Sequence, residues 1–153
     1  MHMQVPYLIS ILVIDEIPLI RVGLQEVFRT IDPAIRVEYT DSVFRALSSR
    51  EYENKRFHLV ILGSDEEKSS ESLLLHATEL KQRFGQPLIM IYSSAYHPII
   101  IEKMPTTGID AYVHKYESIP EILHAYEQLS KGEAYVSGIF HTLYYEYGHG
   151  VRK

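Results

Sequence analysis

Cysteine is absent from the 153-residue chain. Its absence excludes a disulfide scaffold, a zinc ribbon, a thiol nucleophile and an iron–sulfur site. The chain has eight histidines, but none of them shows a metal-site spacing such as His-x-x-x-His. The sequence therefore gives no sign of a transition-metal centre.

Basic clusters and long apolar segments are also lacking. The net charge is −5, from 15 basic and 20 acidic residues, and no basic run is longer than the two residues of Arg152–Lys153. Phosphate backbones are bound by clustered Lys and Arg, so we expect no direct nucleic-acid contact. The longest nearly uninterrupted apolar run, residues 9–14, is too short to span a bilayer, and residues 1–7 lack the features of a signal peptide. We expect a cytoplasmic protein without a membrane partner.

Short apolar segments alternate with helical patterns along the chain. Runs rich in branched and aromatic residues, typical of strands buried on both faces, lie at residues 8–14, 35–39, 57–62, 88–92 and 111–114. Apolar residues at helical spacing predict helices near residues 19–31, 42–50, 69–84, 96–107 and 119–131, and Asp41 is the expected N-cap of the second. This alternation predicts an α/β, flavodoxin-like, doubly wound five-stranded parallel sheet of order 2-1-3-4-5 with helices on both faces.

The length fits one domain, which we place at residues 8–137. Residues 138–153 form a tail rich in Tyr, His and Gly. This tail is predicted to be a linker or a short amphipathic helix. Its aromatic residues favour docking against their own domain over a ligand site.

Polar residues follow several of the predicted strands. In open parallel sheets, ligands bind beyond the carboxyl ends of the strands, where the strand order reverses. The residues at these ends are Asp15, Glu16, Gly63, Ser64, Asp65, Tyr92, Ser93, Ser94 and Lys115. Paired carboxylates facing a lysine suit a divalent cation beside a phosphoryl group, although strand-end carboxylates also cap helices or simply face water.

Three segments carry a resemblance to a known family. ILVIDEIPLIRVGL at residues 11–24, TGIDAYVHK at residues 107–115 and KGEAYVS at residues 131–137 are similar to the two ends of bacterial response-regulator receiver domains. The subfamily is the NarL/FixJ type, which carries a C-terminal helix-turn-helix. The resemblance implies a CheY-like fold and a role in two-component phosphorelay signal transduction.

In such receivers, a histidine kinase's phosphoryl group moves to an aspartate at the end of the third strand. An acidic pair holds Mg²⁺, a lysine contacts the phosphoryl oxygens, and a Ser or Thr at the end of the fourth strand reports the modification. By resemblance, Asp15 and Glu16 match the acidic pair, and Lys115 matches the lysine. Tyr112 matches the aromatic residue that swings with the switch hydroxyl.

Two positions depart from this pattern. Gly63 stands where the phosphoacceptor aspartate belongs, and Tyr92 stands where the small hydroxyl belongs. Glycine has no side chain to phosphorylate, and its presence leaves two rather than three anionic ligands for Mg²⁺. We therefore expect no resident cofactor and at best a weak Mg²⁺ site at Asp15 and Glu16. Bulky Tyr92 is expected to crowd the phosphoryl pocket.

The resulting hypothesis is a non-enzymatic, atypical receiver that signals by phosphorylation-independent contact with a protein partner or a second copy. The expected surface is the last helix (near residues 119–131) with its preceding strand, or that helix with the first. Transcription regulation would belong to a helix-turn-helix outside this chain, and the role of a histidine kinase stays open.

Two alternatives remain. Asp65 lies two residues after Gly63, on the same strand face if the strand continues, and could be the acceptor of an Mg²⁺-dependent, phosphorylatable receiver. The other alternative is a flavodoxin-like small-molecule binder. The segment Asp15-Glu16-Ile17-Pro18 argues against it, because it is anionic and lacks the glycines of a phosphate-binding loop.

Overall fold

A computed structural model describes residues 8–65 and 68–148 of the chain. The strands are β1 (Ser10–Ile14), β2 (Arg36–Thr40), β3 (Leu59–Ser64), β4 (Leu88–Ser93), β5 (Ala111–His114) and β6 (Tyr135–Val136). They form one parallel sheet of order β2-β1-β3-β4-β5-β6. The predicted α/β class and the order of the first five strands are confirmed, and a sixth strand is added.

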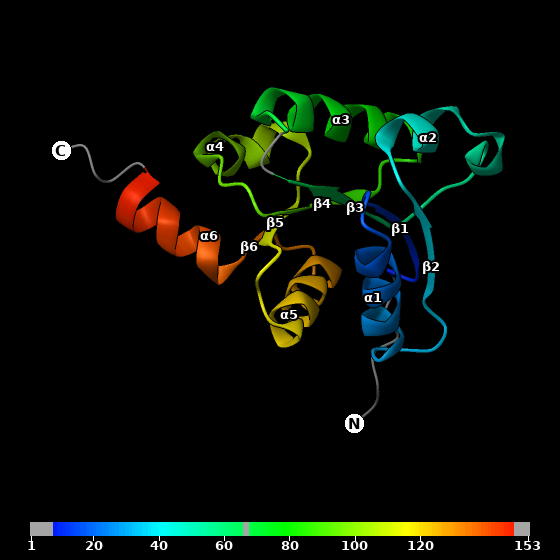
Figure 1. Cartoon of the computed structure of the whole chain (residues 1–153), viewed down its shortest axis with the longest axis horizontal. Coiled ribbons are helices and arrows are strands. Elements are labelled where there is room, and N and C mark those ends of the chain that lie inside the picture. The colour runs from blue at the N-terminus through cyan, green and yellow to red at the C-terminus, as the bar shows by residue number, and fades with distance from the viewer. Residues whose placement is uncertain (1–7, 66–67, 149–153) are drawn as a thin grey trace.

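Helices cover both faces of this sheet (Figure 1). They are α1 (Pro18–Arg29), α2 (Val43–Ser48), α3 (Ser70–Arg83), α4 (Pro98–Thr107), α5 (Ile119–Ser130) and α6 (Gly138–Leu143), with a 3₁₀ turn η1 (Arg50–Tyr52) and a π-helical turn η2 (Tyr144–Gly148). The first and fifth helices lie side by side on one face, and the second, third and fourth lie on the other (Figure 1). None of the helices in the described part of the chain is long and apolar enough to cross a membrane.

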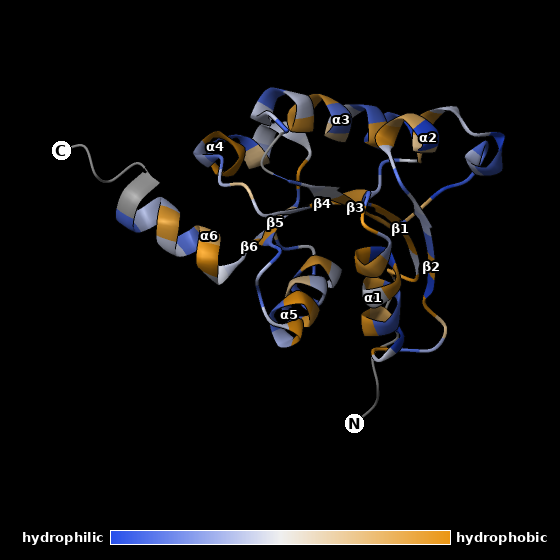
Figure 2. Cartoon of the chain, viewed as in Figure 1, coloured by the Kyte–Doolittle hydropathy of each residue, from blue (hydrophilic) through white to orange (hydrophobic). Residues whose placement is uncertain are grey.

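The strands are buried on both faces, as their apolar runs predict. In β1, Ile11 and Val13 pack toward α1 and α5, whereas Leu12 and Ile14 pack toward α2, α3 and α4. Figure 2 shows hydrophobic colouring along β1 and β3 and in stripes along the helices. Two apolar cores, one on each side of the sheet, therefore hold the strand ends in fixed positions.

The start of α2 differs from the prediction. Ser42, not Asp41, is its N-cap: the Ser42 side chain accepts a hydrogen bond from the Arg45 backbone N at 3.1 Å. A cap residue must directly precede the first helical residue, which here is Val43. Asp41 lies one residue too early and instead lines the cavity described below.

The packed unit extends past residue 137, where the sequence analysis placed the end of the domain. β6 pairs with β5, and Phe140 of α6 is fully buried. Part of the predicted tail is thus a helix docked against its own domain. Residues 149–153 of that tail lie outside the described residues.

Candidate functional site

A small cavity of about 60 Å³ opens where β1 and β3 end. This is the point at which the strand order reverses, where ligands bind in open α/β sheets. Polar and charged side chains line the cavity, together with one glycine: Asp15, Glu16, Asp41, Ser42, Gly63, Ser64, Asp65, Lys68 and Lys115. The predicted acidic pair, the glycine, the alternative acceptor and the lysine are thus brought together.

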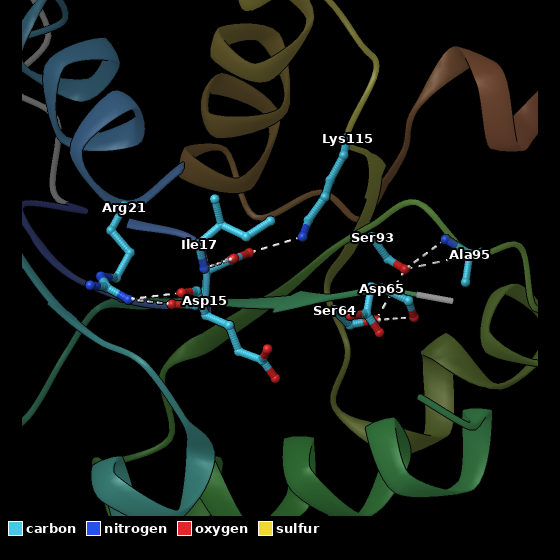
Figure 3. A network of polar contacts seen from close by, with 9 residues as sticks. Asp15, Ile17, Arg21, Ser64, Asp65, Ser93, Ala95 and Lys115 are labelled. Carbon is cyan, nitrogen blue, oxygen red and sulfur yellow. Dashed lines mark hydrogen bonds and ion pairs between the residues drawn. The ribbon is translucent and has the colours of Figure 1, made fainter. Parts of the chain in front are cut away.

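Asp15 is the most buried charged side chain of this cavity, with 4% of its surface exposed. One carboxylate oxygen, Oδ1, accepts a hydrogen bond from the Ile17 backbone N at 2.9 Å. The other, Oδ2, forms an ion pair with Lys115 Nζ at 3.0 Å (Figure 3). Arg21 braces the same loop, because its guanidinium donates to the Asp15 backbone O at 2.8 Å. Two contacts therefore hold the carboxylate, and a third holds the backbone that carries it.

Gly63 makes room for this carboxylate. A Cβ atom on residue 63 would lie 2.7 Å from Asp15 Cγ, closer still to Asp15 Oδ2, and 2.9 Å from the backbone O of Ile14. Real Cβ atoms are essentially never found within 3.0 Å of such neighbours. The carboxylate of Asp15 thus fills the space that any side chain at position 63 would need.

The ends of β3 and β4 are joined by a pair of hydroxyl groups. Ser64 Oγ donates to Ser93 Oγ at 3.1 Å, and Ser93 Oγ accepts from the Ala95 backbone N at 2.9 Å (Figure 3). Ser93 is completely buried, whereas Ser64 lines the cavity. A hydroxyl is therefore present at the end of the fourth strand. In the register of the two strands, Tyr92, which the resemblance matches to the small hydroxyl, is the partner of Gly63, and Ser93 is the partner of Ser64.

Tyr92 is the strand partner of Gly63 but is not among the residues that line the cavity. Its ring packs in the core formed with α1 and α5, and Lys115 Nζ lies 5.9 Å from the ring centroid. Adjacent residues of a strand point to opposite faces, so Ser93, and not Tyr92, points toward Ser64. Burial, and secondarily the Asp15 carboxylate, raise the pKa of Tyr92, which keeps the phenol neutral.

Tyr112 is fully buried away from the cavity wall. Its hydroxyl donates to the Ala95 backbone O at 2.6 Å and accepts from the His97 backbone N at 2.9 Å. Burial raises the pKa of Tyr112 far above its ordinary value, so the phenol acts as a neutral hydrogen-bonding group. Tyr112 and Tyr92, the two predicted switch positions, do not meet. Tyr112 is instead connected to Ser93 through Ala95.

The residues at this cavity do not fit a magnesium site. The ammonium of Lys115 already lies against Asp15 Oδ2, and position 63 supplies no carboxylate. Glu16 is exposed at the rim. In the described part of the chain, no group of three or more His, Asp or Glu side chains could hold a metal ion. Octahedral Mg²⁺ binds through hard oxygen ligands, and a lysine against the inner carboxylate opposes it.

Asp65, the alternative acceptor, follows the last residue of β3 and lies exposed at the rim of the cavity. Its backbone O accepts a long hydrogen bond of 3.4 Å from Ser64 Oγ. The strand ends before Asp65, so strand alternation does not fix where its side chain points. Asp65 adds negative charge to the cavity beside Asp15 and Glu16.

Two contacts of this site were not predicted from the sequence. Arg21 belongs to the segment that carries the family resemblance, but its hydrogen bond to Asp15 joins residues six apart, a spacing that a local pattern does not reveal. The Ser64–Ser93 pair depends on the register of β3 against β4. The available signal was the serine that lies two residues after the predicted end of the third strand and one residue after that of the fourth.

Several solved structures share this fold. A LuxR-family DNA-binding response regulator from Silicibacter pomeroyi has a TM-score of 0.66 and 21% identity, covering 82% of this chain and 95% of that chain. The isolated REC domain of RcsB from Salmonella enterica serovar Typhimurium, solved in the presence of phosphomimetic BeF3−, has a TM-score of 0.68 and 15% identity, covering 88% of this chain and 97% of that chain. A LuxR-family two-component response regulator from an Aurantimonas species has a TM-score of 0.63 and 21% identity, covering 86% and 91%.

These likenesses establish the fold. The chain has the CheY-like, flavodoxin-type fold of response-regulator receiver domains. No family profile and no curated protein matches the sequence.

Proposed function

We propose that the chain is an atypical receiver domain of a two-component response regulator, and that it signals through protein–protein contact without phosphorylation. The observation that carries this proposal is the Asp15–Lys115 ion pair, which lies in the space next to the bare backbone of Gly63. The receiver fold supports the signalling class.

The ion pair argues against phosphoryl transfer on electrostatic grounds. An incoming phosphoryl group is anionic, and it would meet the carboxylates of Asp15, Glu16 and Asp65 at the same cavity. The lysine that receivers direct at the phosphoryl oxygens is neutralised here by Asp15 at 3.0 Å. Opposite charges at this distance and burial attract each other much more strongly than they would in water. Binding a phosphoryl group would require separating this pair.

The test is the response to a phosphoryl mimic. Beryllofluoride with Mg²⁺ should leave the amide NMR resonances of Gly63, Ser93 and Tyr112 unchanged at millimolar concentration. Mg²⁺ alone controls for metal binding. A saturable, Mg²⁺-dependent shift of these resonances with beryllofluoride would contradict the proposal.

Asp65 as phosphoacceptor is the second candidate, because its side chain lies at the cavity immediately after β3. Incubation with acetyl phosphate and Mg²⁺ would then add one phosphoryl group, which intact-protein mass spectrometry detects as an acid-labile adduct. Asp65→Asn would abolish the adduct. The matched control, Asp41→Asn, removes another carboxylate that lines the same cavity. No adduct on the native chain eliminates this candidate.

We further propose that a second copy of this chain is the partner, bound through α1 and α5. Large apolar side chains are exposed on these helices: Leu19 is 78% exposed, Val22 45% and Ile119 56%. The other predicted surface, α5 with β5, is less available, because β6 pairs with β5 and Phe140 packs over it. This favours the first and last helices of the prediction as the contact.

Gly23 provides a clean test of this surface. No atom lies within 4 Å of a Cβ built at Gly23, so a larger residue there leaves the monomer intact. Gly23→Arg should abolish self-association measured by sedimentation equilibrium, while the melting temperature does not fall. Thr78→Arg, at an exposed position of α3 on the opposite face of the sheet, is the matched control. A monomeric native chain, or a dimer that tolerates Gly23→Arg, would refute this interface.

Transcription regulation, if the protein performs it, would come from an attached helix-turn-helix. The described part of the chain has no basic cluster suited to DNA, and its acidic balance opposes such binding. In this proposal, the receiver contributes pairing and leaves base contacts to another domain.

A further inference from the structure

The C-terminal segment formed by β6 and α6 packs against β5 beside α4 (Figure 1). The ring of Phe140 is fully buried and stacks on Tyr112, with 3.9 Å between centroids and 14° between planes. It also lies 6.1 Å from the Tyr96 ring and 4.9 Å from the His114 ring. We refer to Tyr96, Tyr112 and His114 as the aromatic cluster.

Hydrogen bonds add to these ring contacts, and Val136 and Leu143 of the segment pack against the same core. The Ile139 backbone N donates to the Glu117 carboxylate at 2.7 Å, which satisfies one amide at the start of α6. The Ser137 backbone N donates to Tyr112 O, and Ser137 Oγ accepts from the His114 backbone N, both at 3.0 Å. A helix of six residues is not stable in isolation, so α6 depends on its docking contacts. Such a segment can open without unfolding the rest of the domain.

Tyr112 links this segment to the cavity. One face of its ring stacks on Phe140, while its hydroxyl bonds Ala95 O and His97 N in the β4–α4 loop. In turn, Ser93 Oγ accepts from Ala95 N and bonds Ser64, which lines the cavity. An unbroken series of contacts therefore runs from the cavity wall to α6.

We propose that the aromatic cluster is a docking site occupied by the chain's own helix α6, and that docking of α6 is coupled through Tyr112 to the order of the β4–α4 loop beside the cavity. The observation that supports this proposal is that Tyr112 contacts both α6 and the β4–α4 loop. Phe140 of α6 stacks on its ring, and the backbone of Ala95 and His97 bonds its hydroxyl. Coupling of this kind is reciprocal, so loosening the loop must also weaken the docking of α6. The proposal extends beyond the proposed function and does not depend on Gly63.

Amide hydrogen exchange on the full chain tests the coupling. Phe140→Ala should speed exchange at least tenfold in α6 and also at the His97 amide, which donates to Tyr112, and the Ala95 amide, which donates to Ser93. Thr142→Ala, at an exposed position of the same helix, is the matched control and should exchange like the native chain. Faster exchange in α6 with unchanged exchange at His97 would overturn the coupling. Unchanged exchange in α6 would overturn the docking role of Phe140.

The effect of the loop on α6 is tested with Tyr112→Phe, which removes the hydroxyl and keeps the stacked ring. This change should speed exchange at His97 and, through the coupling, in α6. A loosened loop with native exchange in α6 would reject the proposal. Phe140→Leu keeps an apolar side chain but removes the ring stack, so it gives the same test if Phe140→Ala does not fold.

Discussion

The carboxylate of Asp15 and the ammonium of Lys115 lie 3.0 Å apart, although the two residues directly follow strands, β1 and β5, that are not neighbours in the sheet. Only 3% and 11% of their side-chain surfaces are exposed. Water reaches neither group well, so each charge is stabilised mainly by the opposite charge of the other side chain. Removing either partner leaves a buried, uncompensated charge, which is strongly destabilising.

Lys115→Met should therefore lower the free energy of unfolding by about 3 kcal/mol. The long apolar side chain retains the packing of the lysine stem and removes only the charge. Urea denaturation followed by circular dichroism measures the effect. Asp15→Asn combined with Lys115→Met should recover part of the loss, because no unpaired charge is left buried. Additive losses in the double variant would contradict the pairing.

Gly63→Ala should destabilise the chain by about 1–3 kcal/mol, the usual range for overpacking. The added methyl group would lie within 3.0 Å of both the Asp15 side chain and the Ile14 carbonyl. Urea denaturation of Gly63→Ala, Asp15→Ala and the double variant forms a cycle. In the double variant, the penalty for the added methyl group should be smaller, because the carboxylate is gone. Equal penalties in both backgrounds would show that Asp15 does not fill this space.

Gly23 and Gly132 should respond in opposite ways to alanine. Neither has an atom within 4 Å of a built Cβ, but Gly132 has a φ of +82° and Gly23 lies inside α1. Gly23→Ala should raise the free energy of unfolding by about 1 kcal/mol, because alanine favours helix. Gly132→Ala should lower it by about 1–2 kcal/mol, because left-handed backbone disfavours a Cβ. Thermal unfolding under monomeric conditions measures both, and equal effects would contradict this account.

Stability should fall as the pH decreases below about 6.5, the ordinary pKa of histidine. Burial lowers the pKa of His114, with an opposing effect from Glu117, and its Nδ1 accepts from the Tyr116 backbone N, so the folded state holds the neutral ring. The unfolded chain binds that proton more readily, so acidification favours unfolding. His114→Gln should flatten the dependence between pH 7.5 and 5.5 in urea titrations. His76, whose pKa burial and Lys68 also lower, contributes in the same direction and is tested by His76→Gln.

The fold was predictable because its strands carry their own signal. Leu12 and Val13 point to opposite faces, and both are completely buried, so an uninterrupted apolar run marks β1 without any knowledge of its neighbours. β6 has no such signal. Tyr135 and Val136 are only partly buried, and they become a strand because β5 offers an open edge. That condition is a property of the assembled sheet and not of the segment.

The site was predictable in composition but not in geometry. Strand ends identified Asp15, Gly63 and Lys115 as neighbours, because the carboxyl ends of parallel strands meet at one edge. Which of Tyr92 and Ser93 points toward Ser64 depends on the register of β3 against β4, and a shift of one residue reverses it. The Asp15–Lys115 contact depends on rotamers and on the space left at position 63, neither of which the sequence encodes locally.

The brevity of β6 has a consequence for the behaviour of the protein at high concentration. With only two residues, the outermost strand presents too few free backbone amides and carbonyls to recruit an extended segment of another molecule. The opposite border, β2, carries Arg36 and a Glu38 side chain bonded to Lys55, and charge at a sheet border also discourages such recruitment. Both edge strands are thus poor templates for amyloid-like growth. Two copies of the chain would therefore associate through their helices.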